Sequence, residues 1–234
     1  MKEFLLLLFI ILPMITTQGE ERVILLHGLA RSSHSMNKME TALAKAGYQV
    51  SNIGYPSRKH RIEDLAKMVR EEVKEVSDEG DTLHFVAHSL GGIILRYIQK
   101  HDPLENLGKV VMLSPPNQGS EVVDKLGGWL IFKWINGPAG CQLGTDENGF
   151  VKSLGAVDFE LGVLTGDRSI NLILSLMIPG KDDGKVSVEN AKVEGMDDFM
   201  ILHVSHPYIM KNKTAIHQTI HFLHSGQFDR TAAQ

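Results

Sequence analysis

The nine residues HFVAHSLGG, at positions 84–92, decide how this 234-residue chain is interpreted. A short apolar run typical of a buried strand leads directly into Ser89 and two glycines, and a helical pattern, IILRYIQKH, follows. A backbone that turns this sharply needs small residues two positions before and two positions after the serine, and Ala87 and Gly91 supply them. Such a turn holds a serine hydroxyl above the edge of a sheet, whereas an ordinary serine at a helix start only caps the first turn.

Strand and helix patterns alternate on both sides of this stretch. Apolar runs predict strands at 22–28, within 46–57, and at 81–88, 109–116, 160–166 and 198–205. Apolar residues at helical spacing predict helices around 36–43 and at 60–76, 91–101 and 214–224. This alternation predicts an α/β fold, with a mostly parallel central sheet, helices on both faces and a cap-like insertion at 121–158. Ligands bind such sheets at the carboxyl ends of the strands.

Composition excludes several classes of function. A formal charge of −4 and a pI near 6.3 give no electrostatic reason to expect nucleic acid as a partner. The single cysteine, Cys141, permits no intrachain disulfide, and with no strand before it we interpret it as a loop thiol. No HExxH motif or close cluster of histidine and carboxylate occurs in the sequence, so we expect no metal, although the sequence does not address incidental calcium. The acyl-enzyme chemistry expected below needs no organic cofactor.

The first residues carry an apolar run, from Phe4 to Ile15, behind a short head that contains Lys2. We interpret residues 1–19 as an export signal and residues 20–234 as one catalytic domain that is exported to the periplasm or secreted. The alternative is an uncleaved segment that anchors the protein to a membrane.

A serine hydroxyl needs a base to take its proton and an acid to orient that base. We expect the base just past the last strand, where His206 precedes a proline; the alternative, His203, alternates with apolar residues inside the strand pattern. For the acid, Asp183 is preferred because a glycine follows it and Val186 can anchor its loop. The alternatives, Asp182 and Asp167, are more typical of residues that cap turns.

The order Ser89, Asp183, His206 along the chain is the order that α/β-hydrolases show. A tetrahedral intermediate also needs amide donors, and we expect these to be the backbone N–H groups of Leu29 and Leu90. His27, in the same HG motif as the first donor, is interpreted as a residue that stabilises the turn.

Five segments together resemble the α/β-hydrolase superfamily, and more narrowly its small bacterial lipases and esterases: VILLHGL, VAHSLGG, LSPPNQGSEV, KDDGKVSV and VSHPYIM. The resemblance covers residues 23–223. It implies Ser89 as nucleophile, Asp183 as acid, His206 as base, and Leu29 and Leu90 as oxyanion donors. The first position of the usual GxSxG elbow is alanine here, which also occurs in that group.

The insertion at 121–158 contains the apolar segment GGWLIFKWINGPAG, and we name Trp129, Phe132 and Trp134 as candidate substrate-binding residues. This segment could line an acyl pocket or cover it as a lid, or it could be a buried helix without substrate contact.

The expected reaction is hydrolysis of a carboxylic ester, small or lipid, through an acyl-enzyme. An acyltransferase, a thioesterase or an amidase would use the same residues, and a catalytically silent binding module could share the fold. Contact with a membrane surface is left open, and no sequence feature indicates an oligomeric state.

Overall fold

A computed structural model describes residues 19–231, so all but the last residue of the predicted export signal lies outside the described residues. The predicted α/β fold is confirmed: six strands form one sheet in the order β2-β1-β3-β4-β5-β6, and every neighbouring pair is parallel. The strands are β1 (Glu21–Leu26), β2 (Gln49–Ile53), β3 (Thr82–His88), β4 (Leu107–Leu113), β5 (Leu161–Gly166) and β6 (Asp198–Leu202).

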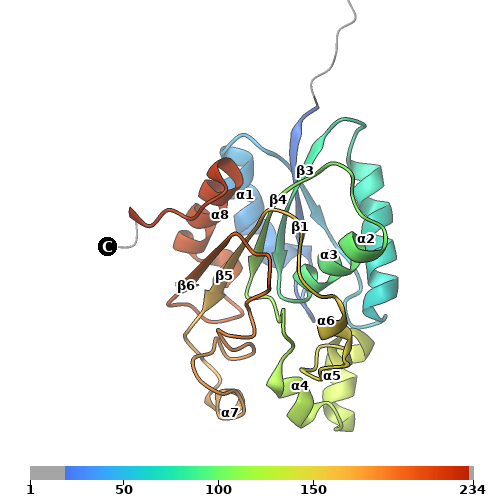
Figure 1. The fold of residues 1–234 in the computed structure, drawn as a ribbon, viewed down its shortest axis with the longest axis vertical. Coiled ribbons are helices and arrows are strands. Elements are labelled where there is room, and N and C mark those ends of the chain that lie inside the picture. The colour runs from blue at the N-terminus through green and yellow to red at the C-terminus, as the bar shows by residue number, and fades with distance from the viewer. Residues whose placement is uncertain (1–18, 232–234) are drawn as a thin grey trace, which may run out of the picture.

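Helices cover both faces of the sheet, as Figure 1 shows. On one face lie α1 (Asn37–Lys45) and α8 (Lys213–Ser225), and on the other lie α2 (Ile62–Val76) and α3 (Leu90–His101). In α2, five buried apolar residues recur at helical spacing, with charged residues between them. Two apolar cores result, one on each side, since alternate residues of each central strand face opposite helix layers. A short 3-10 turn, η1 (Ser33–Met36), leads into α1, and another, η2 (Ile209–Lys211), leads toward α8.

All six strands point the same way, so their carboxyl ends meet at one edge of the sheet, the lower edge in Figure 1. Among the described residues, the non-glycine residues with positive φ are Ala30, Ser89 and Ser114, and each follows the end of β1, β3 or β4. Such backbone costs roughly 1–3 kcal/mol per residue and tends to gather at functional sites. Backbone strain therefore indicates this edge of the sheet as the candidate functional site.

The insertion at 121–158 forms short helices beside the same edge: α4 (Glu121–Leu126), α5 (Leu130–Cys141) and α6 (Phe150–Ser153). Helix α5 is kinked, because Gly137 has a φ of 66° and Pro138 follows it. A Cβ at Gly137 would clash with the backbone oxygen of Arg58, so the kink packs closely against the loop after β2. Cys141 is the exposed last residue of α5 rather than a loop residue. On the other side of the edge lies α7 (Leu172–Ser175).

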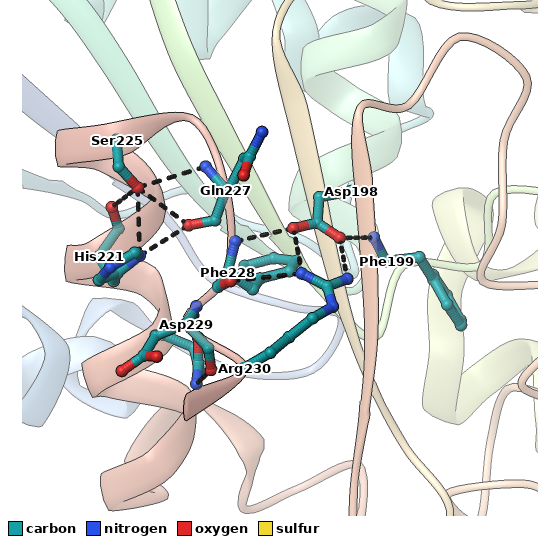
Figure 2. A network of polar contacts seen from close by, with 9 residues as sticks. Asp198, Phe199, His221, Ser225, Gln227, Phe228, Asp229 and Arg230 are labelled. Atoms are coloured by element: carbon teal, nitrogen blue, oxygen red, sulfur yellow. Dashed lines mark hydrogen bonds and ion pairs between the residues drawn. The ribbon is translucent and has the colours of Figure 1, made fainter. Parts of the chain in front are cut away.

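The segment after α8 is tied back to the start of β6 by the polar network in Figure 2. Asp198 accepts hydrogen bonds from Arg230, at 2.5 and 2.9 Å, and from the amide of Phe228 at 2.7 Å. Burial raises the pKa of Asp198, but the hydrogen bonds and charge of Arg230 outweigh burial and leave this pKa below its usual value. The network closes over the edge strand far from the carboxyl ends of the sheet.

Within residues 19–231, no helix is long and apolar enough to cross a membrane.

Candidate active site

Ser89 occupies the turn between β3 and α3. Its φ of 52° and ψ of −118° place it outside the helix, and its amide donates to the carbonyl of Leu113 at 2.9 Å. A Cβ at Gly91 would lie 2.8 Å from both Cβ and the carbonyl oxygen of Leu26. The turn can therefore sit against β1 only with glycine at this position, which is the steric reason for the elbow pattern.

His206 lies in the loop after β6 and meets Ser89 there. Its Nε2 is 3.0 Å from Oγ of Ser89, and its Nδ1 is 2.8 Å from Oδ2 of Asp183. The His206 amide also donates to the carbonyl of Asp183 at 2.9 Å, so backbone and side chain both join the two loops. All three side chains are buried. The structure thus brings together the serine, the base and the acid that the sequence analysis preferred.

Two backbone amides, as well as the imidazole of His206, hold the carboxylate of Asp183 in place. Its Oδ1 accepts hydrogen bonds from the amides of Lys185, at 3.0 Å, and Val186, at 2.9 Å. Burial raises the pKa of Asp183, but the charge of His206 and the hydrogen bonds that it receives outweigh burial, so the pKa lies below its ordinary value. A carboxylate that stays ionised and fixed in place can orient an imidazole and stabilise its protonated form.

The alternative acid and base pair with each other instead. Asp167 accepts from Nδ1 of His203 at 2.9 Å, and this pair lies near the surface, with 76% of the His203 side chain exposed. The expectation that His203 lies inside the last strand was wrong: β6 ends at Leu202, because the strand pattern extends past the last residue that pairs with β5. Asp182 accepts from the amide of Gly184 and from the hydroxyl of Ser175.

The loop after β1 lies beside the serine. Among the described residues, neither the amide of Leu29 nor that of Leu90 donates to a protein acceptor. The next residue, Ala30, has a φ of 56°, and its amide donates to the hydroxyl of Ser57 at 3.1 Å. This contact ties the loop after β1 to the loop after β2. The amides of Leu29 and Leu90, without a protein acceptor, remain the candidate oxyanion donors.

His27 stabilises the loop after β1 through contacts with Tyr55. Its ring stacks on Tyr55, with centroids 4.0 Å apart, and the Tyr55 hydroxyl donates to the His27 carbonyl. Burial lowers the pKa of His27. Its contacts are those of a residue that stabilises a turn.

His88 is a residue whose role the sequence reasoning missed. It is buried between Ser89 and the loop after β1; a Cβ at Gly28 would lie 2.7 Å from its Nδ1. Its ring is 4.9 Å from that of His206, and Nε2 is 3.2 Å from the His206 carbonyl. Burial, together with the charge of His206, lowers the pKa of His88 well below its usual value. The only available signal was its place directly before the serine in the quoted stretch.

A cavity of about 260 Å³ opens beside Ser89 and His206. Residues of α4 and α5 line it, and so does Leu174 of α7. Its apolar lining consists of Leu29, Pro116, Val122, Val123, Leu126, Phe132, Ile135, Leu143, Leu174 and Val186. Such a lining is typical of a site for an apolar ligand.

Only one of the three candidate substrate-binding residues reaches this cavity. Phe132 lines it, whereas Trp129 and Trp134 do not. The two tryptophans are 65% and 83% exposed, because α5 directs Phe132 toward the cavity and Trp134 toward solvent. A role for the tryptophans in substrate binding stays a prediction. The insertion is neither a fully buried helix nor remote from the site.

Within residues 19–231, no group of three or more histidine, cysteine or carboxylate side chains is arranged to hold a metal ion.

Solved structures with the same fold include a lipase, a phospholipase and a carboxyl esterase. A lipase of Bacillus licheniformis in its mature form superimposes with a TM-score of 0.69 at 20% identity, covering 88% of this chain and 92% of that one. The phospholipase PlaB of Legionella pneumophila gives 0.68 at 20% identity, over 89% of this chain and 60% of that one. A metagenomic carboxyl esterase gives 0.67 at 18% identity, over 83% and 66%. At these identities the similarity establishes the fold.

Sequence comparison goes further. Curated protein sequences gave no match. The sequence profile of palmitoyl protein thioesterases, however, matches residues 22–153, more than half of the chain. The matched segment includes Ser89 and ends before Asp183 and His206. The expected place in the α/β-hydrolase superfamily, among hydrolases related to esterases and lipases, is thereby confirmed, and the chain belongs to the palmitoyl protein thioesterase family.

Proposed function

We propose that this protein hydrolyses carboxylic esters of fatty acids through an acyl-enzyme, with Ser89 as nucleophile, His206 as base and Asp183 as the acid that orients it. One observation carries the proposal: a buried chain of short contacts, 2.8 and 3.0 Å, links the three side chains at the wall of an apolar cavity. This arrangement supports Ser89 as the nucleophile, His206 as its base and the cavity as the space for the acyl chain.

In the first half of the reaction, Nε2 of His206 takes the proton of Ser89 as Oγ attacks the carbonyl carbon of the ester. The carbonyl becomes a tetrahedral oxyanion, and the amides of Leu29 and Leu90 donate to it. His206 then gives its proton to the leaving alkoxide, and an acyl-enzyme remains. In the second half, His206 takes a proton from water, which attacks the acyl carbon and forms a second oxyanion; the bond to Oγ then breaks, His206 returns the proton to Oγ of Ser89, and the fatty acid leaves. No metal or organic cofactor takes part in this scheme.

The acyl chain occupies the cavity in this proposal, with Phe132 in its wall. Export after cleavage near residue 19 stays a prediction, as does the alternative of a membrane anchor.

We also propose contact between the cap and a lipid surface. Helix α5 and the residue before it expose Trp129, Leu130, Ile131 and Trp134, and α7 and the residue after it expose Ile173 and Leu176. Exposed apolar residues on elements that line a cavity are typical of an interaction site, and tryptophan suits the boundary between water and lipid.

A thioesterase is the second candidate, and the family match favours it. The chemistry of Ser89, His206 and Asp183 is the same; only the leaving atom changes from oxygen to sulfur. An acyltransferase and an amidase use the same residues, but no observation favours them.

The test combines a covalent probe with matched substrates. A fluorophosphonate should label the wild type at Ser89, and Ser89→Ala should abolish labelling while the circular dichroism spectrum stays that of a folded protein. Octanoyl esters and thioesters with similar leaving groups would then rank the two candidates by kcat/KM. A folded wild type that takes up no probe and hydrolyses neither substrate would favour a silent binding module.

A further inference from the structure

Two cations stand beside the nucleophile. Apart from histidine, Arg31 and Lys185 are the only charged side chains among the described residues that line the cavity; no aspartate or glutamate lines it. This contrasts with the chain as a whole, whose formal charge is −4. The cavity is therefore apolar inside and locally positive.

Arg31 and Lys185 lie in the loops that carry the proposed oxyanion donor Leu29 and the proposed acid Asp183. Arg31 follows Leu29 by two residues, and Lys185 follows Asp183 by two. The Lys185 amide donates to Asp183, and the Lys185 carbonyl accepts from the hydroxyl of Ser120 at 2.8 Å. These two hydrogen bonds fix the backbone of Lys185 relative to the carboxylate of Asp183, so the Cα of Lys185 has a defined position.

Neither cation is neutralised within the described part of the protein. Arg31 and Lys185 form no ion pair there, and both reach solvent. Partial loss of solvation and repulsion from Arg31 lower the pKa of Lys185. Attraction to Asp183 acts in the opposite direction, but Asp183 is already paired with His206. The charges of Arg31 and Lys185 also lower the pKa of His88, next to Ser89. Two like charges that line one cavity without an ion-pair partner favour the binding of an anion there.

We propose that Arg31 and Lys185 bind an anionic group, a phosphate or a carboxylate, on the leaving-group part of the substrate. The inference rests on the proposed function and narrows its substrate class. The acyl chain fills the apolar part of the cavity, whereas the cations reach solvent, so the anion belongs to the part of the substrate that stays outside. Guanidinium and ammonium groups are the usual protein partners of phosphate and carboxylate oxygens.

The test compares two soluble esters that differ in one charge: the octanoyl ester of 4-hydroxyphenylacetate and that of 4-hydroxyphenylacetamide. The wild type should prefer the anionic ester by kcat/KM, and the preference should shrink as salt is added. A second arm compares vesicles of phosphatidylglycerol with vesicles of phosphatidylcholine. Faster hydrolysis of phosphatidylglycerol would identify a lipid headgroup as the source of the anion, and preference limited to the soluble ester would identify a water-soluble substrate.

The variants are Arg31→Gln and Lys185→Gln, and the readout is the ratio of kcat/KM for the anionic and neutral esters. Each should lower this ratio by up to about fivefold, as expected for an ion pair open to solvent, and the double variant by more. Lys181→Gln is the matched control: it removes the same charge from the same loop, but Lys181 lies outside the cavity and pairs with Asp167. Its ratio should stay that of the wild type.

Two results would overturn the inference while leaving the proposed function intact. One is a wild type that hydrolyses the neutral ester at least as well as the anionic one. The other is a pair of variants that slow both esters equally, since the residues would then only shape the loops. A wild type that hydrolyses neither ester nor vesicles would instead sink the proposed function itself.

Discussion

Replacing Asp183 by asparagine tests the proposed site most directly, because the change keeps the size of the side chain and removes its charge. The Oδ1 atom can still accept from the amides of Lys185 and Val186. The atom that faces Nδ1 of His206, 2.8 Å away, becomes an NH₂ group. Two donors cannot face each other, so the imidazole changes tautomer and places its proton on Nε2.

The cost follows from that tautomer. Nε2 lies 3.0 Å from Oγ of Ser89 and, once protonated, can no longer accept the proton of the hydroxyl. Loss of the correct tautomer in such a site lowers kcat by roughly 10⁴-fold. At about 1.36 kcal/mol for each factor of ten, this corresponds to roughly 5.4 kcal/mol in the activation barrier.

The protein supplies its own control. Asp167 also contacts a histidine, His203, at 2.9 Å, but 76% of that ring is exposed and the pair lies away from the cavity. Asp167→Asn should therefore change kcat by less than about twofold and stability by less than about 1 kcal/mol. Both variants would be assayed with p-nitrophenyl octanoate, and circular dichroism would verify that they fold. If Asp183→Asn kept more than a tenth of wild-type kcat, or if Asp167→Asn were the damaging change, the assignment of the acid would be wrong.

Three further predictions concern the elbow, the cap and the buried histidines. Gly91→Ala should destabilise the protein by about 1–3 kcal/mol, because its Cβ would lie 2.8 Å from Leu26, whereas Gly128→Ala, with no atom within 4 Å, should be neutral in urea unfolding; equal effects would contradict the steric account of the elbow. Replacing Trp129 and Trp134 together by serine should weaken binding to phosphatidylglycerol vesicles by at least about tenfold, since each ring could bury a large apolar area, while Ile201→Ser on β6 should not; vesicle flotation measures this, and equal binding by both variants would refute the proposed lipid contact. Burial lowers the pKa values of His27, His84 and His88, so below about pH 6.5 the unfolded chain binds protons that the folded protein does not. The free energy of unfolding should therefore fall between pH 7.5 and pH 5.5, by up to about 1.4 kcal/mol per pH unit for each histidine, and a value that stayed constant or rose would contradict these shifts.

Local sequence was sufficient for the six strands, for the four helices that cover the sheet and for the elbow, but not for the short helices of the insertion and of the loops. The apolar run of 84–88, the small residues at 87 and 91, and the helical spacing after them report on backbone geometry within a few residues, and such geometry is written in consecutive side chains. The choice of His206 over His203 also rested on local sequence, because a residue just past a strand can turn over the sheet edge. The structure places His206 next to Ser89 and leaves His203 on the surface.

Only the tertiary structure shows in which direction the side chains of an element point. Residues 129–135 are apolar on almost every side of their helix, so their spacing does not predict which face packs against the cavity. In the structure, α5 packs at the sheet edge with Phe132 toward the cavity and Trp134 toward solvent. The meeting of Arg31 and Lys185 beside Ser89 was equally invisible, because the two residues are far apart in the chain and only the parallel sheet brings their loops to one edge. Sequence periodicity determines which elements form, whereas their packing decides which side chains share a site.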